Sequence, residues 1–393
     1  MPNRRGFFRL NLHFLFFLSG IVTVLIGQVL PIFARQFSLS DLQVSWFFPS
    51  QFAGSLVGTF FTSRFARRND YRMATIVGGF AMIAGVLLMN FGAFPIVITG
   101  FFINGIGIGM TLPSINMIVL EMSPERTASS LSILNFCWGV GAIVCKPFVD
   151  LWSTTDGIGL TTILLAIPMA ISTVLLLLDR SYKPLLPELS DPETSGPSIA
   201  IWRQPIAWLI ALFNLIHVGF ESGMGGWLTT YTGRLDGGPI FPLASPTLLY
   251  FVFFVAGRGV APILFRFLSE GKMLMFGLQT ILAGMVVVIV ADSVLVLSFG
   301  SVIAGFGTSW VFPTNVSRFS NEFGPEANRR SAPFFIAGTL GAAISTWLIG
   351  FISEISGNLR SGMYVLLISV TLLIVLQIGL GLRARSVVKI ERA

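Results

Sequence analysis

The sequence has few charges for its length. Only 11% of its 393 residues are charged and 54% are hydrophobic, and its mean hydropathy is +0.82. A soluble domain carries roughly 25% charged residues, so this chain could not cover a water-facing surface. The shortage of charge excludes a soluble globular protein and indicates an integral membrane protein.

Residues and motifs that carry common chemistries are also scarce. The two cysteines, Cys137 and Cys145, share one apolar segment and form no CxxC pair or disulfide framework. The two histidines, His13 and His217, lie far apart, so we expect no metal site and no cofactor. The chain has no Walker loop, no Gly-x-Ser-x-Gly elbow and no His-Glu-x-x-His motif. We therefore expect neither direct use of ATP nor enzymatic activity.

The net charge of +7 does not indicate a nucleic-acid partner. The basic residues are scattered between apolar runs and form no single face or tail. Arg4, Arg5 and Arg9 precede an apolar run that continues to about residue 34. This run is longer than the apolar region of a secretory signal, and no small-x-small cleavage site follows it. We interpret it as a retained first span.

Long apolar runs fill most of the chain. A helix needs about 20 apolar residues to cross a bilayer. By that length we expect twelve spans, at about 10–34, 43–63, 73–91, 95–119, 127–149, 158–179, 205–232, 245–265, 273–291, 294–317, 331–352 and 360–382. A polar segment at 180–204 divides them, which predicts a six-helix bundle over 1–179, a linker loop over 180–204 and a second bundle over 205–393.

The basic residues also predict the orientation, since lysine and arginine gather on the cytoplasmic side of membrane proteins. With the N-terminus inside, the external loops receive only Arg35, Arg234 and Arg360 of the 25 basic residues, and Lys146 and Arg258 fall within spans. All the others lie on the inner side. We expect a protein of the bacterial inner membrane with both termini in the cytoplasm, in contact with lipid and monomeric.

One spaced pattern occurs twice, about two hundred residues apart. Gly105-Ile106-Gly107 followed by Pro113 recurs as Gly305-Phe306-Gly307 followed by Pro313. Downstream, the segment 121–125 (EMSPE) recurs one residue late as 322–326 (EFGPE). A hydrophobic protein with two similar halves is typical of secondary transporters, whose substrate site lies where the halves meet.

Twelve spans in two repeated halves resemble the major facilitator superfamily over essentially the whole chain. Gly58 followed by 63–68 (SRFARR) is similar to the loop signature of that family, with Ser63 where Asp is expected and Ala66 where Gly is expected. Gly105, Gly107, Gly109, Pro113 and Asn116, with Asn135, Gly139, Gly141 and the 221–227 run, resemble the fucose–galactose–glucose permease branch. That resemblance implies a sugar or sugar-like substrate and proton- or sodium-coupled alternating access.

Three charged residues stand inside expected spans, where a charge costs roughly 2.5–3.5 kcal/mol on insertion scales. They are Lys146, Glu221 and Arg258. We expect Glu221 to take up the coupling proton while Arg258 binds substrate or tunes Glu221, and the alternative is a salt bridge that ties their two spans together. For Lys146, the alternatives are a place in an anion site, snorkelling to the lipid headgroups and pairing with Asp150 one turn on.

Neutral polar groups complete the expected site. His217 lies one turn before Glu221 on the same helical face and either relays a proton or hydrogen-bonds within the bundle. Candidate substrate-binding residues are Asn135, Trp138, Asn214, Gln28 and Asn315, in addition to Arg258 and Lys146. Asparagine suits sugar hydroxyls, and an indole face suits a sugar ring.

The sequence thus predicts an all-α membrane protein, a secondary transporter of a small polar solute. A sugar or sugar-like substrate is preferred. An organic anion such as a sugar acid or carboxylate, bound by Arg258 and Lys146, and a drug or siderophore efflux pump are alternatives. A membrane sensor or enzyme on the same scaffold is the rival from another class.

Overall fold

The computed structural model describes residues 4–68, 70–123, 127–154, 157–179, 182, 201–235, 244–324 and 330–391. These residues form helices and turns, with no sheet among them. The chain divides into two compact units, 1–194 and 195–393, and each is described here by itself. Most of the linker and the second part of each repeated acidic segment (Pro124, Glu125, Pro325 and Glu326) lie outside the described residues.

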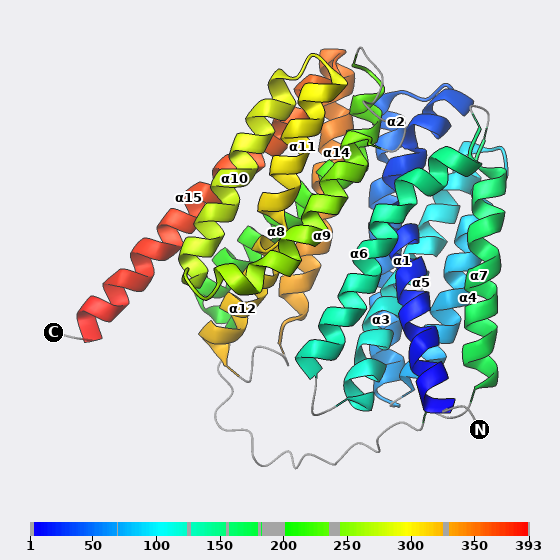
Figure 1. The fold of residues 1–393 in the computed structure, drawn as a ribbon, viewed down its shortest axis with the longest axis horizontal. Helices are drawn as coiled ribbons and strands as arrows, with labels where there is room; N and C mark the ends of the chain where they lie inside the picture. The colour runs from blue at the N-terminus through cyan, green and yellow to red at the C-terminus, as the bar shows by residue number, and fades with distance from the viewer. Residues whose placement is uncertain are drawn as a thin grey trace. The chain divides into compact units, whose positions relative to one another are not determined.

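The first unit contains six long helices (Figure 1). They are α1 (Arg4–Gln36), α3 (Phe47–Ala66), α4 (Tyr71–Leu88), α5 (Phe94–Met122), α6 (Thr127–Trp152) and α7 (Gly159–Leu178). A short helix, α2 (Asp41–Ser45), precedes α3 and was not expected from the sequence. Ser40 begins α2 with a capping box, because its hydroxyl accepts from the Gln43 amide while the Gln43 side chain accepts from the Ser40 amide.

The second unit repeats this plan. Its helices are α8 (Pro205–Thr232), α9 (Pro246–Leu264), α10 (Glu270–Val290), α11 (Val294–Thr308), α12 (Val311–Phe323), α14 (Ala332–Ser356) and α15 (Leu359–Glu391). The expected span at 294–317 is two helices, α11 and α12, separated by Ser309 and Trp310. If α11 and α12 are counted as one span, the second unit has six spans among its described residues.

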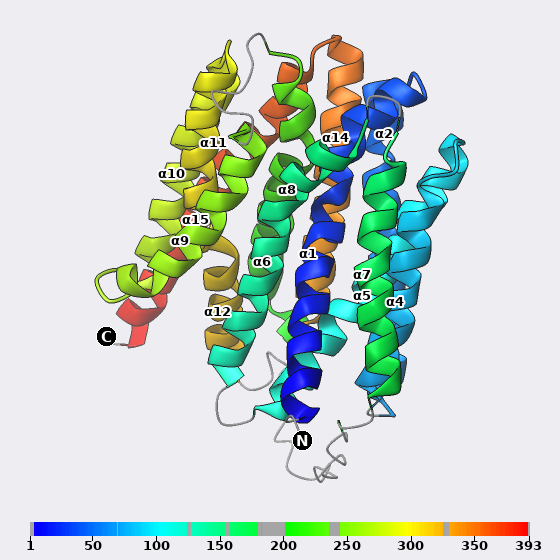
Figure 2. The ribbon, with the colours of Figure 1, turned by 45° about the vertical axis from the view of Figure 1, so that its right-hand side comes forward.

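Equivalent helices pair in both units. In the first unit α5 packs between α3 and α4, and α1 packs on α6, whereas in the second α11 packs between α9 and α10, and α8 packs on α14. Figure 2 shows α1 beside α6 from a second direction. Among the described residues, eleven spans are long and apolar enough to cross a membrane. The twelfth, α3, has a lower hydropathy because it contains Gln51, several serines and Arg64. The expectation of an all-α protein with twelve spans in two similar bundles is confirmed.

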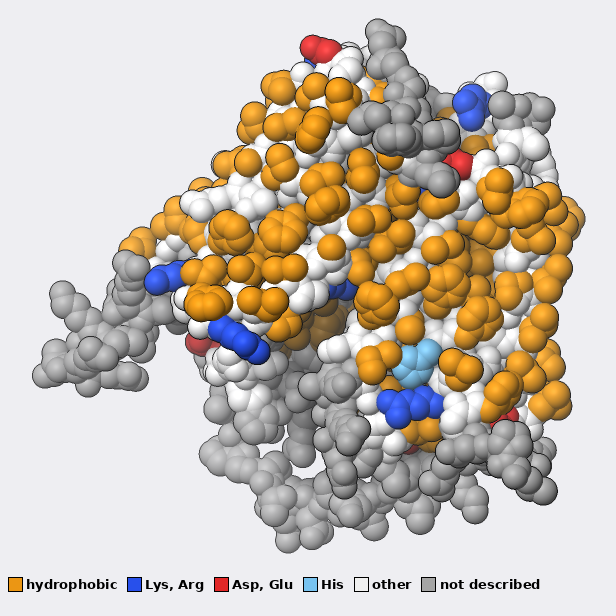
Figure 3. Space-filling model, viewed as in Figure 1, with side chains coloured by type: hydrophobic (Ala, Val, Ile, Leu, Met, Phe, Trp, Pro, Cys, Tyr) orange, Lys and Arg blue, Asp and Glu red, His pale blue; other side chains and the backbone are white. Residues whose placement is uncertain are grey.

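The outer surface is apolar, as a lipid-facing surface requires. Figure 3 shows hydrophobic side chains over most of the described surface of one face, with most charged side chains near the helix ends. Large apolar residues such as Phe60, Ile171, Phe299 and Ile368 are more than half exposed. In water this exposure would be costly, whereas lipid tails solvate it.

The close approach of helices explains the repeated glycines. A Cβ at Gly105 would collide with the Gln51 backbone of α3, and one at Gly305 would collide with the Tyr250 backbone of α9. Gly107 and Gly307 meet α4 and α10 in the same way. Small residues let helix backbones approach in a membrane, where association depends on packing. The repeat therefore marks the central, most tightly packed helix of each bundle.

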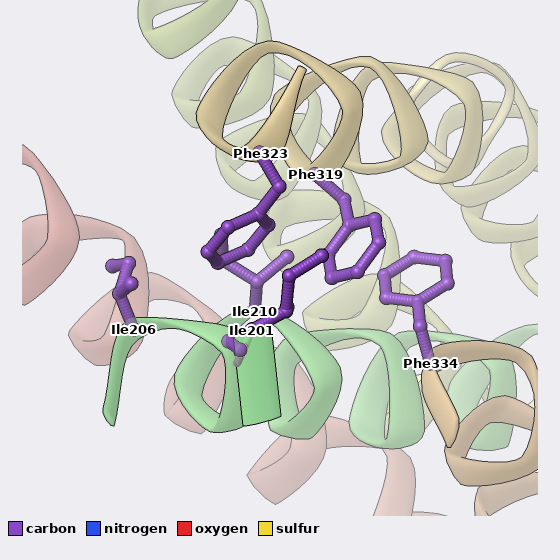
Figure 4. Close-up of a cluster of buried hydrophobic side chains, with 7 residues drawn as sticks. Ile201, Ile206, Ile210, Phe319, Phe323 and Phe334 are labelled. Carbon is purple, nitrogen blue, oxygen red and sulfur yellow. The ribbon is translucent and has the colours of Figure 1, made fainter. Parts of the chain in front are cut away.

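The end of the linker is bound to the second unit. Ile201 lies in a short 3₁₀ helix, η3 (Ile201–Arg203), and is fully buried against α8, α12 and α14. Figure 4 shows Phe319 and Phe323 of α12 directed toward Ile210 of α8 and the neighbouring Ile201. The indole of the next residue, Trp202, donates to the Arg330 carbonyl at 2.9 Å. These contacts hold 201–203 to the helix bundle.

Candidate functional site

Helix α8 carries the one acid of the candidate site. It begins with Pro205 at its first position, where the missing amide costs nothing. Gly219 lies against the Gly341 backbone of α14, and Gly223 lies against Leu366 of α15 and Ile349 of α14. These glycines allow one face of α8 to pack closely against the bundle. Glu221 lies between them in the sequence, with 24% of its side chain exposed.

His217 lies beside Glu221, as their spacing predicted. The imidazole is fully buried, and its Nε2 is 3.7 Å from Oε2 of Glu221. Neither ring nitrogen has a hydrogen-bond partner among the described residues. A buried imidazole without partners is uncommon, since unpaired polar groups in an apolar setting are costly. The imidazole therefore faces the carboxylate without a hydrogen bond to it.

Arg258 comes from the neighbouring helix α9. Its Nε donates to the Ser309 carbonyl at 3.3 Å, and its guanidinium carbon lies 4.2 Å from the centre of the Phe254 ring. Among the described residues, no ion pair with a nitrogen–oxygen distance of 4.0 Å or less joins Arg258 and Glu221. The two charges interact electrostatically at longer range. The salt bridge considered as one interpretation of this pair is therefore not formed in this structure.

Tyr250 was missed by the sequence reasoning. It lies on α9 two turns before Arg258, it is fully buried, and its ring stacks with that of Phe254 at 6.1 Å. Its hydroxyl interacts with the Thr308 side chain of α11 and lies within electrostatic range of Glu221 and Arg258. The signal was available, because 250, 254 and 258 share one helical face. Its apolar neighbours in the sequence do not distinguish it from a packing residue.

Two of the expected substrate-binding asparagines are engaged between helices. The Asn214 amide donates to the Phe334 carbonyl of α14 at 2.9 Å. The Asn315 amide of α12 donates to the Ile210 carbonyl of α8 at 3.4 Å. Both side chains are buried, and the Oδ1 atom of each lacks a described partner. Their hydrogen bonds connect α8 to α14 and to α12, and the Oδ1 atom of each asparagine is left as an acceptor.

The remaining candidates belong to the first unit. Asn135 is exposed and donates to the Leu131 carbonyl of its own helix at 2.8 Å. Trp138 is half-buried, and its backbone is the surface that Gly20 of α1 approaches. Gln28 is buried in α1. The ammonium of Lys146 forms an ion pair with Asp150, the i, i+4 pairing that the sequence offered as one alternative.

The structure thus brings Glu221, His217 and Arg258 together in the second unit, with Tyr250 beside them. Asn214 and Asn315 lie on helices of the same unit. The first unit contributes a separate set, in which only Lys146 carries charge and that charge is already paired. A cluster of one acid, one imidazole, one guanidinium and one phenol can hold and exchange a proton and can hydrogen-bond a polar solute. No group of ligands suited to a metal ion occurs among the described residues.

Comparison with known proteins agrees with this architecture. The sequence profile of the Major Facilitator Superfamily matches residues 12–326. A glucose/galactose transporter of Brucella abortus is 22% identical over 384 residues, covering 90% of this chain and 89% of that protein. The chain belongs to the Major Facilitator Superfamily, and it is an integral membrane transporter.

Solved structures show the same fold. The transporter FucP, in its outward conformation, superposes with a TM-score of 0.64 at 18% identity, covering 94% of this chain and 97% of FucP. A peptide transporter solved with sulfate superposes with a TM-score of 0.77 at 14% identity, covering 96% of this chain and 94% of that one. Proteins with different substrates share this fold, so the fold alone does not choose a substrate.

Proposed function

We propose that this protein is a secondary active transporter that moves a sugar or sugar-like solute across the bacterial inner membrane, coupled to protons through Glu221. The observation that carries the proposal is the cluster around Glu221. A carboxyl group that is partly buried, beside an unpartnered imidazole and within range of a guanidinium, can alternate between protonated and ionised forms. His217 is the group best placed to relay the proton.

The substrate class rests on sequence similarity. The Brucella relative is named for glucose and galactose and aligns over nearly the whole chain. The proposed substrate contacts are Asn135 and Trp138 in the first unit, with Gln28 as a further contributor there. In the second unit they are Asn214, Asn315 and Arg258. Their amides and rings match the hydroxyls and apolar faces of a sugar. Alternating access of the two units would expose them to either side of the membrane in turn.

The orientation and the membrane are inferred from the distribution of basic residues. External loops would carry only Arg35, Arg234 and Arg360, so both termini would lie in the cytoplasm. A C-terminal fusion to green fluorescent protein should fluoresce, and a fusion to alkaline phosphatase at the same point should be inactive. The reverse pair of results would overturn the orientation.

The decisive experiment uses purified protein in proteoliposomes. Uptake of radiolabelled glucose, galactose and fucose would be measured with and without an inward proton gradient. We expect gradient-driven uptake of at least one sugar, and we expect Glu221→Gln to abolish it while leaving counterflow measurable. Glu354→Gln, which changes an exposed acid at the end of α14, is the matched control and should keep driven uptake. Driven uptake that survives Glu221→Gln would remove Glu221 from coupling.

An organic anion is the second candidate, favoured by one observation. The Nε of Arg258 is engaged with Ser309, and the described residues offer its two terminal nitrogens no hydrogen bond. A guanidinium presents such nitrogens as a fork that fits a carboxylate. Lys146 is paired with Asp150, which leaves Arg258 as the cation for this role.

Thermal shift distinguishes the two substrate classes, because a ligand that binds only the folded form raises its stability. Galactose and galacturonate differ only in the carboxylate, so they form a matched pair of ligands. If the substrate is an acid, Arg258→Gln should reduce the shift caused by galacturonate much more than any shift caused by galactose. Equal reduction for both ligands would assign Arg258 a structural role and exclude the anion candidate.

A further inference from the structure

The second repeated proline leaves one backbone carbonyl without its usual donor. Proline has no amide hydrogen, so Pro313 cannot donate to the carbonyl four residues earlier, which is that of Ser309. In a membrane such a carbonyl needs another partner, since no bulk water is available. The Nε of Arg258 takes this place at 3.3 Å. The intramembrane guanidinium therefore supplies the donor that residue 313 would offer this carbonyl in a continuous helix.

In the first repeat, the carbonyl freed by proline meets an uncharged donor. Pro113 leaves the Gly109 carbonyl of α5 free, and the hydroxyl of Thr62 on α3 lies within hydrogen-bond distance of it at 3.1 Å, as it does of the Gly58 carbonyl in its own helix. Thr59, also on α3, approaches the same carbonyl at 3.5 Å. In this half α5 continues unbroken from Phe94 to Met122. The two halves thus share the freed carbonyl and differ in the donor.

The second-half span is interrupted where Arg258 binds. Helix α11 ends at Thr308 and α12 begins at Val311. Trp310, between them, is buried, stacks on Phe276 of α10 at 5.8 Å and donates its indole N–H to the Met273 carbonyl at 3.0 Å. Gly257 lets α9 approach so closely that an added Cβ would collide with Ser309. The break is therefore held between α9 on one side and α10 on the other.

The orientation of the guanidinium links this break to the acid. One nitrogen is fixed on Ser309, and the Phe254 ring covers the plane at 4.2 Å, so little freedom is left. The charge of Glu221 acts on the same guanidinium from α8. A change of charge at Glu221 alters the force on a group that holds the helix break. The first half has no equivalent, because a threonine hydroxyl carries no charge.

We propose that Arg258 is a positioning residue that ties the charge of Glu221 to the shape of the broken α11–α12 span, by donating Nε–H to the carbonyl that Pro313 leaves free. The proposal rests on the proposed coupling role of Glu221 and adds the mechanical route by which protonation reaches the backbone. Protonation of Glu221 removes the attraction on the guanidinium, and the Ser309–Trp310 segment then takes a different conformation.

The groups that could titrate near Glu221 are few. His217 lies on α8 itself, and Tyr250 and Arg258 face it from α9. The other helices packed against α8 place their charged or titratable groups elsewhere. Arg318 of α12 lies over Phe213, two turns away, and Glu322 lies one turn further along α12. Arg203 of η3 precedes the first residue of α8, and Glu354, Arg360 and Tyr364 lie near the ends of α14 and α15. The described part of α11 carries none. His217→Gln is therefore the control for titration of the imidazole.

Fluorine NMR of the full-length protein in nanodiscs tests the proposal without a substrate. The eight tryptophans would be replaced by 5-fluorotryptophan, and the Trp310 resonance assigned by its loss in Trp310→Phe. Trp310 reports directly on the break. We expect its chemical shift to change with pH in the wild type and in His217→Gln, and to be constant in Glu221→Gln.

Three variants separate the hydrogen bond from the charge. Glutamine places an amide nitrogen as many bonds from Cα as Nε, so Arg258→Gln should keep the Trp310 resonance near its wild-type position and remove its pH dependence. Arg258→Met lacks both donor and charge and should shift or broaden the resonance. Adding Pro313→Ala to Arg258→Met returns an amide donor to the Ser309 carbonyl and should restore the wild-type position, because only the missing hydrogen bond is replaced.

Two results would overturn the proposal: an unchanged Trp310 resonance in Arg258→Met, or no recovery in the double variant. If Arg258→Met does not fold, the pH response of Arg258→Gln decides, and a response equal to the wild type counts against the proposal. Thr62→Val in the first half should leave the Trp310 pH response intact. If these NMR predictions fail while Glu221→Gln abolishes gradient-driven uptake, only the route through Arg258 is rejected. Uptake retained in Glu221→Gln would reject the coupling function itself.

Discussion

A proline frees one backbone carbonyl in each half of the molecule, and the two carbonyls meet different donors. In the first, the carbonyl freed by Pro113 accepts from the uncharged hydroxyl of Thr62, and α5 is one continuous helix. In the second, the carbonyl freed by Pro313 accepts from the cation Arg258, and the span is divided into α11 and α12. A duplicated frame can therefore keep its packing while one copy gains a charge. The repeat thus provides the scaffold, and the departure from it marks the candidate site.

Transport should respond most strongly to a change at the second of these carbonyls. Arg258→Met should reduce proton-driven uptake by about 5- to 150-fold, the usual range of a coupling free energy between two sites. Thr62→Val removes the corresponding donor in the first half and should change uptake by less than about two-fold. Initial rates in proteoliposomes measure both, with counterflow as the control for folding. Similar losses in the two variants would show that the halves do not differ in function at this carbonyl.

Close helix approach gives the next largest effect, this time on stability. Gly58 faces the rigid backbone at Ile106, whereas the nearest atom to its second-half equivalent, Gly257, is the rotatable hydroxyl of Ser309. We expect Gly58→Ala to lower the free energy of unfolding by about 1–3 kcal/mol, the range for overpacking, and Gly257→Ala to lower it less. Thermal unfolding in detergent would rank them.

Gly259→Ala is the matched control for these two variants. An added Cβ there meets no atom within 4 Å, so this change should be neutral or stabilising by up to about 1 kcal/mol through helix propensity. An equal cost at all three glycines would mean that backbone entropy, and not contact, sets the result.

A smaller loss of stability is expected from the Thr62 hydroxyl of the first half. Thr62→Val should cost about 1 kcal/mol, the usual net value of one hydrogen bond, because the Gly109 carbonyl loses its nearer donor. Pro113→Ala supplies an intrahelical donor and should recover that loss in the double variant. A double-mutant cycle on unfolding free energies measures the coupling. Strict additivity would show that Thr62 and Pro113 do not share this carbonyl.

The smallest effect concerns the beginning of the linker, which is bound to the first unit. The Tyr182 phenol donates to the Glu121 carboxylate, and its ring stacks on Phe8 at 5.6 Å. Burial first, and then Glu121, raise the pKa of this phenol above its ordinary value of 10.0. The unfolded chain would release this proton near pH 10 while the folded protein keeps it. Stability should therefore fall as the pH rises above 10.

Tyr182→Phe tests this anchor. The variant should lose about 1 kcal/mol at neutral pH, a typical net hydrogen-bond contribution, and its stability should fall less steeply above pH 10. Trp202→Phe removes the anchor at the other end of the linker, whose indole donates to the Arg330 carbonyl. That variant should show a similar loss at neutral pH with no change in the alkaline slope. An alkaline slope equal to the wild type in Tyr182→Phe would contradict the assignment.

Much of the fold could be predicted because lipid imposes simple rules. Each span needs about 20 apolar residues, and all twelve expected ranges contain helices. The repeated Gly105 and Gly305 predicted equivalent helices, and the structure shows the same pairings in both units. The break at Ser309 and Trp310 was not predicted, since hydropathy is continuous across it. Proline alone did not reveal it, because Pro113 stands in an unbroken helix.

Less of the candidate site could be predicted. Glu221, His217 and Arg258 stood out because charge and imidazole are rare in apolar spans. Tyr250 did not, since a buried tyrosine is common in packing. The partners of Asn214 and Asn315 could not be anticipated either, because their acceptors are backbone carbonyls of other helices.

The class of protein, the spans, the duplication and the few costly charges could all be predicted from the sequence, because each follows from local composition and spacing. Only the tertiary structure decided which atom each charge meets. Arg258 is directed to a carbonyl freed by a proline fifty-five positions later, and no local rule connects the two. Hydrogen bonds between helices depend on rotation and depth of each helix in the bundle, and these are fixed by packing of the whole unit.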